Sequence, residues 1–169
     1  MTVPDGFNYV APTTTDVTSA PDPSVVGQPV TFTAVVADVP PTAGTPTGSV
    51  TFDFGDGPPV ASAAPAGGAA TISHTYTSAT GFTVTATCDG GPSFLSSSGT
   101  DAQTVNGAAT TTAVVSSPNP SLVSDPVTVT TTVSPVAPGA GTPTGLTADP
   151  PPRRAPPRPP RGGGTSGWR

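Results

Sequence analysis

TTTDVTSAPDPSVVGQPVTFTAVV at residues 13–36 returns as TTTAVVSSPNPSLVSDPVTVTTTV at residues 110–133. The match runs without a gap over residues 13–48 and 110–145, at an offset of 97 positions, and 22 of the 36 aligned residues are identical. A period near one hundred residues is too long for a solenoid repeat and is typical of tandem β-sandwich domains of about 100 residues each. The repeat therefore predicts one structural unit per period.

Short runs of alternating side chains lie between turn residues throughout the first period. Thr and Val dominate these runs, and β-branched side chains favour the pleated, half-buried surface of a strand. The alternation predicts strands near 13–19, 29–36, 49–54, 69–76, 82–88 and 100–105. Their inward sets are Val30, Phe32, Ala34 and Val36; Val50, Phe52 and Phe54; Ala70, Ile72, His74 and Tyr76; and Phe82, Val84, Ala86 and Cys88. The predicted fold class is an all-β antiparallel sandwich of about seven strands.

The repeat also predicts how the chain is divided. We expect one complete domain at residues 11–107 and a truncated second copy at residues 108–148. Residues 1–10 are interpreted as the end of a preceding module or as disordered, and residues 149–169 as a disordered tail rich in Pro, Arg and Gly. The second copy supplies only two strands, which bury too little surface to offset the entropy of ordering them. We therefore expect residues 109–169 not to form an independently stable domain.

The similarity between the two copies ends abruptly after Gly145. Where the first copy continues SVTFDFGDG, the second continues with LTADPPPRRAPPRPPRGGGTSGWR. Two readings are open: an extended Pro/Arg linker, or an out-of-frame translation of a G+C-rich gene. The second is favoured because the change brings in every basic residue and the only Trp at once. Translating the DNA after the Gly145 codon in the other two frames distinguishes them.

Composition and charge bear on whether the chain folds and on which classes of partner it can bind. Charged residues make up 9% of the chain where about 25% is usual, and the 25 Pro and 20 Gly make disorder the compositional alternative to a folded domain. There is no Lys or Glu; residues 1–148 carry a net charge of −9 and residues 149–169 carry +4. An acidic body without a cation cannot neutralise phosphates, which argues against nucleic-acid binding. We also expect no membrane span, and the first ten residues do not resemble a signal peptide.

The sequence contains few of the side chains that usually take part in catalysis. His74 and Cys88, the only His and Cys, could form a thiol–imidazole pair, but both lie on predicted inward faces. We therefore expect a non-enzymatic protein without a cofactor, in which Cys88 is a small buried hydrophobe that has no disulfide partner.

Asp53 and Asp56 are weak candidates for a calcium site. Two carboxylates beside a glycine turn offer hard oxygen ligands, but their spacing is not that of a D-x-D-x-D-G loop and no Glu follows. The alternative is that both side chains accept hydrogen bonds from the backbone of the turn. We favour that structural role, and no metal is predicted.

Two blocks of the first period carry a family resemblance. VTFDFGDG at residues 50–57, followed by HTYTSATGFTVTATC at residues 74–88, resembles the PKD domain, in which an aromatic-x-Phe-Gly-Asp-Gly turn precedes a His-x-Tyr and a G-x-[FY]-T-V strand. The motif residues are Phe52, Asp53, Phe54, Gly55, Asp56, Gly57, His74, Tyr76 and Phe82. Phe52 stands where PKD modules often carry Trp. The flanking SAPDPSVVGQPVTFTAVV and GTPTGSVTF are similar to bacterial Ig-like repeats, and FNYVAP at residues 7–12 is similar to the closing strand of IPT/TIG domains.

The resemblance implies an Ig-like (PKD-like) β-sandwich that serves as a non-catalytic spacer or adhesive module of a bacterial extracellular or cell-surface protein. Its implied partners are neighbouring modules of the same array and a cell-surface protein or polysaccharide. The alternative is an accessory carbohydrate-binding module of a secreted polysaccharide-degrading enzyme. Sugar-binding faces present flat aromatic side chains, whereas the sequence assigns most of its aromatics to the core. Only Phe7, Tyr9, Phe94 and Trp168 remain, so glycan binding is the less favoured reading.

Overall fold

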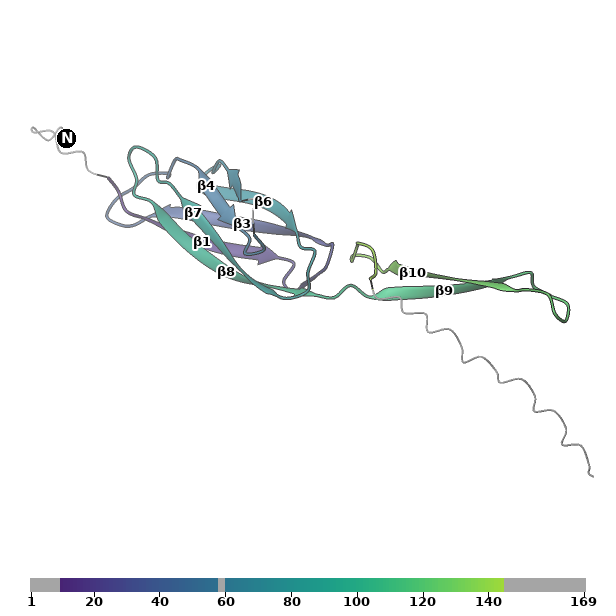
Figure 1. Ribbon diagram of the computed structural model, residues 1–169. Helices are drawn as coiled ribbons and strands as arrows, with labels where there is room; N and C mark the ends of the chain where they lie inside the picture. Colours follow the sequence, from purple (N-terminus) through teal and green to yellow (C-terminus); the bar gives the residue numbers. More distant parts are fainter. Residues whose placement is uncertain (1–9, 58–59, 145–169) are drawn as a thin grey trace, which may run out of the picture.

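The computed structural model describes residues 10–57 and 60–144 and contains only strands and turns within them (Figure 1). None of these residues forms a helix that is long and apolar enough to cross a membrane. The predictions made for residues 1–9 and 145–169, including the FNYVAP similarity and the two readings of the tail, lie outside the described residues. The strands are β1 (Thr13–Ala20), β2 (Ser24–Val25), β3 (Pro29–Asp38), β4 (Val50–Asp53), β5 (Ala61–Ala63), β6 (Ala69–Thr75), β7 (Gly81–Cys88), β8 (Ser97–Asn106), β9 (Thr110–Ser117) and β10 (Thr128–Pro135).

The first eight strands form two sheets packed face to face. One sheet has the order β1-β3-β6 and the other the order β2-β8-β7-β4-β5. Every pairing is antiparallel except that of β2 with β8. Apolar side chains alternate inward along the strands of both sheets, so that the two faces enclose one core. The prediction of an all-β, Ig-like sandwich is confirmed.

The strands depart from the predicted ones in three places. β2 and β5, with two and three residues, were not predicted because short Ser, Val and Ala segments show no clear period. β8 begins at Ser97, earlier than the predicted residue 100, because Ser, Gly and Thr disguise the alternation. Phe54 was assigned to a strand but follows the end of β4, although its side chain is buried as expected.

The core contains the inward residues of the central strands. Val30, Phe32, Val50, Phe52 and Cys88 are fully buried, and the Cys88 thiol is free, as the sequence predicted. Burying a Phe side chain contributes roughly 1.5–3 kcal/mol relative to exposure, which makes these aromatics a main source of stability. Three residues predicted to be inward, Ile72, His74 and Phe82, are only partly buried. Ile72 and Phe82 pack against the edge of the buried core, and His74 stacks on Phe54.

The chain enters and leaves the sandwich at opposite ends (Figure 1). At the entry, the N–H of Ala11 donates to the carbonyl oxygen of Ser93 at 2.9 Å, and the N–H of Leu95 donates to that of Ala11 at 2.8 Å. This parallel bridge ties the approach to β1 to the approach to β8. β8 then runs to Asn106 at the other end, from which a short connection leads to β9.

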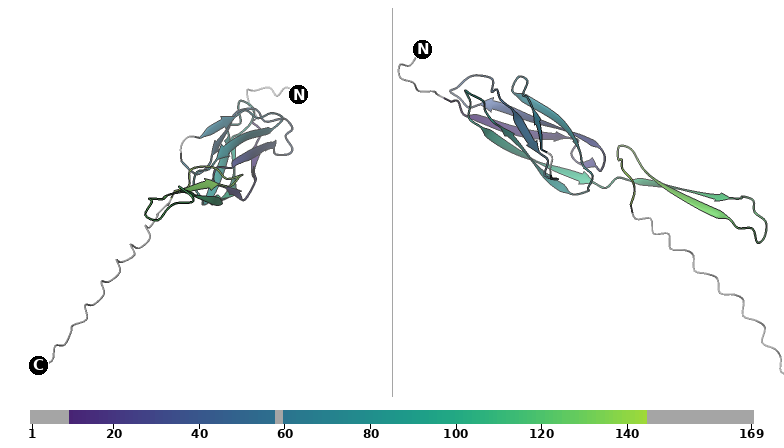
Figure 2. Two further views of the ribbon diagram at one scale, coloured as in Figure 1. Left: turned by 90° about the vertical axis from the view of Figure 1, so that its right-hand side faces the viewer. Right: turned by 45° about the horizontal axis from the view of Figure 1, so that its top comes forward.

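The second copy appears as a two-stranded antiparallel hairpin of β9 and β10, which extends away from the exit end of the sandwich (Figure 2). Its register repeats that of the first copy, because Thr110 pairs with Pro135 as Thr13 pairs with Asp38, 97 positions earlier. Every residue of β9 is exposed, including Val114 and Val115. That the segment from residue 109 onward is not stable by itself stays a prediction.

Candidate functional site

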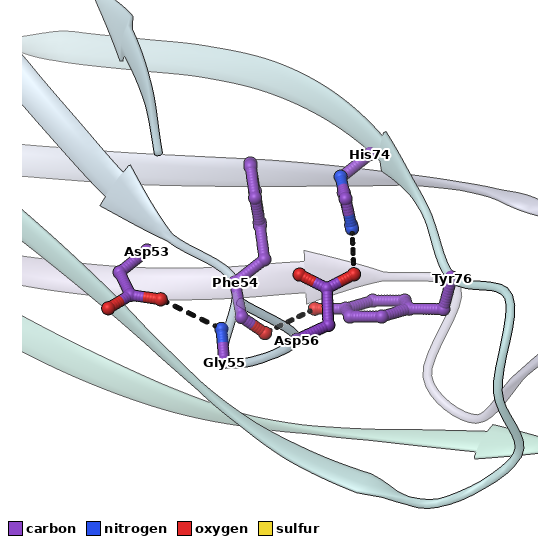
Figure 3. A network of polar contacts seen from close by, with 6 residues as sticks. All are labelled: Asp53, Phe54, Gly55, Asp56, His74 and Tyr76. Atoms are coloured by element: carbon purple, nitrogen blue, oxygen red, sulfur yellow. Dashed lines mark hydrogen bonds and ion pairs between the residues drawn. The ribbon is translucent and has the colours of Figure 1, made fainter. Parts of the chain in front are cut away.

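The PKD-like motif forms a tight turn at the end of β4 (Figure 3). Gly55 and Gly57 have φ values of +76° and +99°, a backbone region that side chains other than glycine adopt at a cost. The carboxylate of Asp53 accepts a hydrogen bond from the N–H of Gly55 at 2.9 Å. This bond spans two residues, as in an Asx turn, and holds the chain in its reversal.

His74 on β6 fixes the tip of this turn. Its Nε2 lies 2.8 Å from Oδ2 of Asp56, and its ring stacks on Phe54 with centroids 4.1 Å apart and planes inclined by 4°. Both side chains of the polar pair are about one quarter exposed, at 23% for His74 and 28% for Asp56. Solvent therefore screens this contact, which contributes about 1 kcal/mol or less. The pair connects β6 to the turn that follows β4, in the opposite sheet.

Tyr76 lies beneath the same turn and is 1% exposed. Its hydroxyl donates a hydrogen bond to the carbonyl oxygen of Phe54 at 3.1 Å. Its ring stacks on Phe82 with centroids 4.2 Å apart and meets the His74 ring edge-on at 4.7 Å. The structure thus brings the aromatic and polar motif residues from β4, β6 and β7 into one cluster, which is built to hold a turn.

The phenol of Tyr76 is kept protonated by its surroundings. Burial is the main cause that raises its pKa, and the nearby carboxylates of Asp56 and Asp101 raise it further. In the unfolded chain the phenol has an ordinary pKa of 10.0, so it ionises at a lower pH than in the folded protein.

We therefore expect stability to fall as the pH rises above about 10. The unfolded state releases the Tyr76 proton while the folded state retains it, so that unfolding becomes more favourable by about 1.4 kcal/mol per pH unit. Urea titrations between about pH 9 and 11.5 would measure the slope for the parent and for Tyr76→Phe. The difference between the two slopes isolates this one phenol, and equal slopes would contradict the assignment.

The structure does not bring His74 and Cys88 together. Cys88 lies opposite Val50 at one end of β4, whereas His74 stacks on Phe54, four residues further along. Four residues of extended chain span roughly 13 Å, too far for a thiol–imidazole hydrogen bond. The described residues therefore do not form the one nucleophile–base pair that the sequence offered.

The structural reading expected Asp53 and Asp56 both to bond to the backbone of the turn, which the structure shows for Asp53 but not for Asp56. One carboxylate accepts from the N–H of Gly55 and the other contacts His74. Within residues 10–57 and 60–144, no three His, Cys, Asp or Glu side chains are grouped so that they could hold a metal ion. For the calcium reading, a thermal melt with and without millimolar CaCl2 is the direct measurement. We expect that calcium changes the melting temperature neither of the parent nor of Asp53→Asn.

Sequence reasoning missed a second polar cluster at the exit end of the sandwich. Gln103 on β8 is 1% exposed, and its Nε2 donates to the carbonyl oxygen of Pro21 and to the hydroxyl of Ser24, each at 3.2 Å. Beside it, the N–H of Thr104 donates to the carboxylate of Asp22 at 2.9 Å. The cluster anchors the segment between β1 and β3 onto β8. Its only sequence signal is that Gln103 shares the alternation of Val105, and a buried amide is not expected from that pattern.

Comparison with known proteins places the motif in a family. The family model described as the PKD domain matches residues 15–98, the segment that contains most of β1, all of β2 to β7 and the turn cluster. Comparison with curated proteins finds no match. The matched segment includes the Phe-Gly-Asp-Gly turn, His74, Tyr76 and Phe82, whose contacts in the structure explain why these residue types occur together. Residues 15–98 of this chain therefore belong to the PKD domain family.

Proposed function

We propose that this chain is a spacer segment of a bacterial extracellular protein, which holds neighbouring domains apart or presents weak contact faces along a rod. PKD domains act as structural or adhesive modules of multi-domain proteins, which agrees with a site built to hold a turn. The neighbours in the array are the expected partners, together with a cell-surface protein or polysaccharide.

The observation that carries this proposal is the path of the chain. It enters the sandwich beside Ser93 and leaves at Asn106 from the opposite end, where the second copy begins (Figure 1). Each module inserted in this way adds its full length to the array. The surface supports a solvated role, because the described residues contain Asp but no Lys or Arg, and a uniform acidic balance opposes self-association.

The entry bridge predicts how the module responds to force. Pulling on both ends of the chain shears the two hydrogen bonds between Ala11 and the segment at 93–95. In optical tweezers, the full chain tethered by its termini should unfold in one cooperative event. The 97 residues from 11 to 107 span roughly 34 nm when extended at about 3.5 Å each. The folded sandwich already spans about the length of one ten-residue strand, roughly 3 nm, so unfolding should release roughly 31 nm. Gradual lengthening at a few piconewtons, with no such event, would contradict the spacer proposal.

Carbohydrate binding is the competing function and has its own test. Among the described residues, Phe94 is the aromatic side chain outside the core cluster and the residues packed against it. A single ring is a small platform for a sugar. We expect the full chain to give no specific signal on a glycan array. A specific signal that Phe94→Ala abolishes, while the thermal melt of that variant matches the parent, would favour the carbohydrate-binding reading.

A further inference from the structure

The exit end of the sandwich carries a tight turn at residues 25–28. The N–H of Gln28 donates to the carbonyl oxygen of Val25 at 3.0 Å, and Gly27 has a φ of +82°. Two further bonds fix the turn to the sandwich: the N–H of Val26 donates to the carbonyl oxygen of Asn106 at 2.9 Å, and that of Gly27 donates to the carbonyl oxygen of Tyr76 at 3.0 Å. The turn is therefore a rigid part of the first module.

The loop that follows β10 rests directly on this turn. The N–H of Ala140 donates to the carbonyl oxygen of Val26 at 3.1 Å. A Cβ atom at Gly27 would lie 2.6 Å from the backbone nitrogen of Ala140 and 2.7 Å from its Cα, closer than real Cβ contacts. The two backbones can meet only because residue 27 has no side chain. Beside the contact lies a groove of about 480 Å³, lined by residues of both parts that include Tyr76 and Pro135.

The second copy contains the same turn with one decisive change. The N–H of Asp125 donates to the carbonyl oxygen of Leu122 at 3.1 Å, and its carboxylate accepts from the N–H of Leu122, as the amide of Gln28 accepts from Val25. At the position of Gly27 this turn has Ser124, with a φ of +75°. The backbone shape is kept, but a side chain now stands where the following loop would have to approach.

We infer that the Val26–Gly27 turn is a docking site for the next module of the array. The contact between this turn and the loop of the next module is called the joint, and the residue at the Gly27 position decides whether the joint forms. The element that docks on this turn is the loop at 138–141 of the second copy. Its counterpart in the first copy is the loop at 41–44, where Ala43 corresponds to Ala140 and is exposed. The loop at 41–44 would dock in the same way on the turn of a preceding module that has glycine at this position. At the turn of the second copy, the side chain of Ser124 would prevent the loop of a following module from docking. This inference rests on the spacer proposal and adds the element that sets the angle between modules.

Amide exchange of the 15N-labelled full chain tests the joint at single residues. The N–H of Ala140 reports the joint, whereas the N–H of Val136, which donates to the carbonyl oxygen of Ala109 at 2.8 Å, reports the hairpin alone. In the parent we expect both to be protected. In Gly27→Ser we expect Ala140 to exchange at least on the order of tenfold faster, with Val136 unchanged. Measurable protection of Ala140 that survives Gly27→Ser, or an unprotected Ala140 in the parent, would overturn the inference.

Two further variants separate the joint from turn strain. Gly67 has a φ of +62°, and a Cβ atom there would meet nothing within 4 Å, so Gly67→Ser introduces comparable backbone strain without touching the joint. It should leave Ala140 protected. Ala140→Pro removes the donor without altering the sandwich, and 15N relaxation should then show the hairpin reorienting independently of the sandwich. Coupled tumbling in Ala140→Pro would count against the joint, whereas the spacer proposal is judged separately by the tweezers experiment.

Discussion

Gly55→Ala is expected to lower the free energy of unfolding by about 3–5 kcal/mol, and Gly57→Ala by only about 1–2 kcal/mol. Both glycines have positive φ values, so both substitutions carry the steric cost of an L-residue in that conformation. Only Gly55 faces a neighbour, because its Cβ would lie 2.6 Å from the carbonyl oxygen of Thr83, whereas a Cβ at Gly57 meets nothing within 4 Å. The backbone oxygen belongs to a paired strand and cannot move away cheaply.

Urea unfolding followed by circular dichroism would compare the two variants with the parent. Gly57→Ala is the matched control for backbone strain, so the excess loss in Gly55→Ala measures the clash with β7. Equal losses in the two variants would show that the close approach of the turn to β7 does not contribute. Because both glycines lie in the motif turn, the comparison also tests whether the first glycine contributes more to stability than the second.

Tyr76→Ala is expected to cost about 3–5 kcal/mol, and Tyr76→Phe about 1–3 kcal/mol. The alanine variant removes a ring that packs on Phe82 and Phe32 and leaves a cavity at the centre of the sandwich. The phenylalanine variant keeps the ring and removes only the donor to the carbonyl oxygen of Phe54, which is then left buried without that partner.

Calorimetric melting of the two Tyr76 variants separates packing from hydrogen bonding. Thr71→Ala, at an exposed site on β6, the strand that ends one residue before Tyr76, serves as the control and should change the stability by about 0.5 kcal/mol or less. If Tyr76→Phe were as damaging as Tyr76→Ala, the hydroxyl rather than the ring would dominate. If Tyr76→Phe were neutral, the bond to Phe54 would contribute nothing net to stability.

Much of the fold could be predicted because its information is local. The alternation of Val30, Phe32 and Ala34 fixes which face of β3 is buried, and the glycines of the motif mark the turn after β4. The resemblance of residues 50–57 and 74–88 correctly indicated a PKD domain. The short strand β2 could not be predicted, because its pairing with β8 depends on a partner about eighty residues away. β5 could not be predicted because its three residues, Ala-Ser-Ala, show no clear alternation.

The candidate site divides in the same way. The sequence grouped His74 and Tyr76 with the turn residues in one motif. It did not indicate that the imidazole would stack on Phe54 and contact Asp56, since those contacts join opposite sheets. The buried amide of Gln103 carried no recognisable signal, because its partners at Pro21 and Ser24 lie about eighty residues away. Partial exposure of Phe82 likewise follows from how the sheets meet and not from the strand pattern.

By itself, the sequence determined the all-β class, the 97-residue period and the inward faces of β3, β4, β6 and β7, because side-chain alternation and glycine turns act within a few residues. Only the tertiary structure showed that His74 contacts Asp56, that Gln103 is buried, and that Ala140 approaches Gly27 too closely for a side chain at residue 27. The N–H of Ala140 donates to the carbonyl oxygen of Val26, 114 positions earlier, at 3.1 Å, and the adjacent Gly27 leaves room for this contact. Such a distance is set by the packing of complete elements, which no local pattern records.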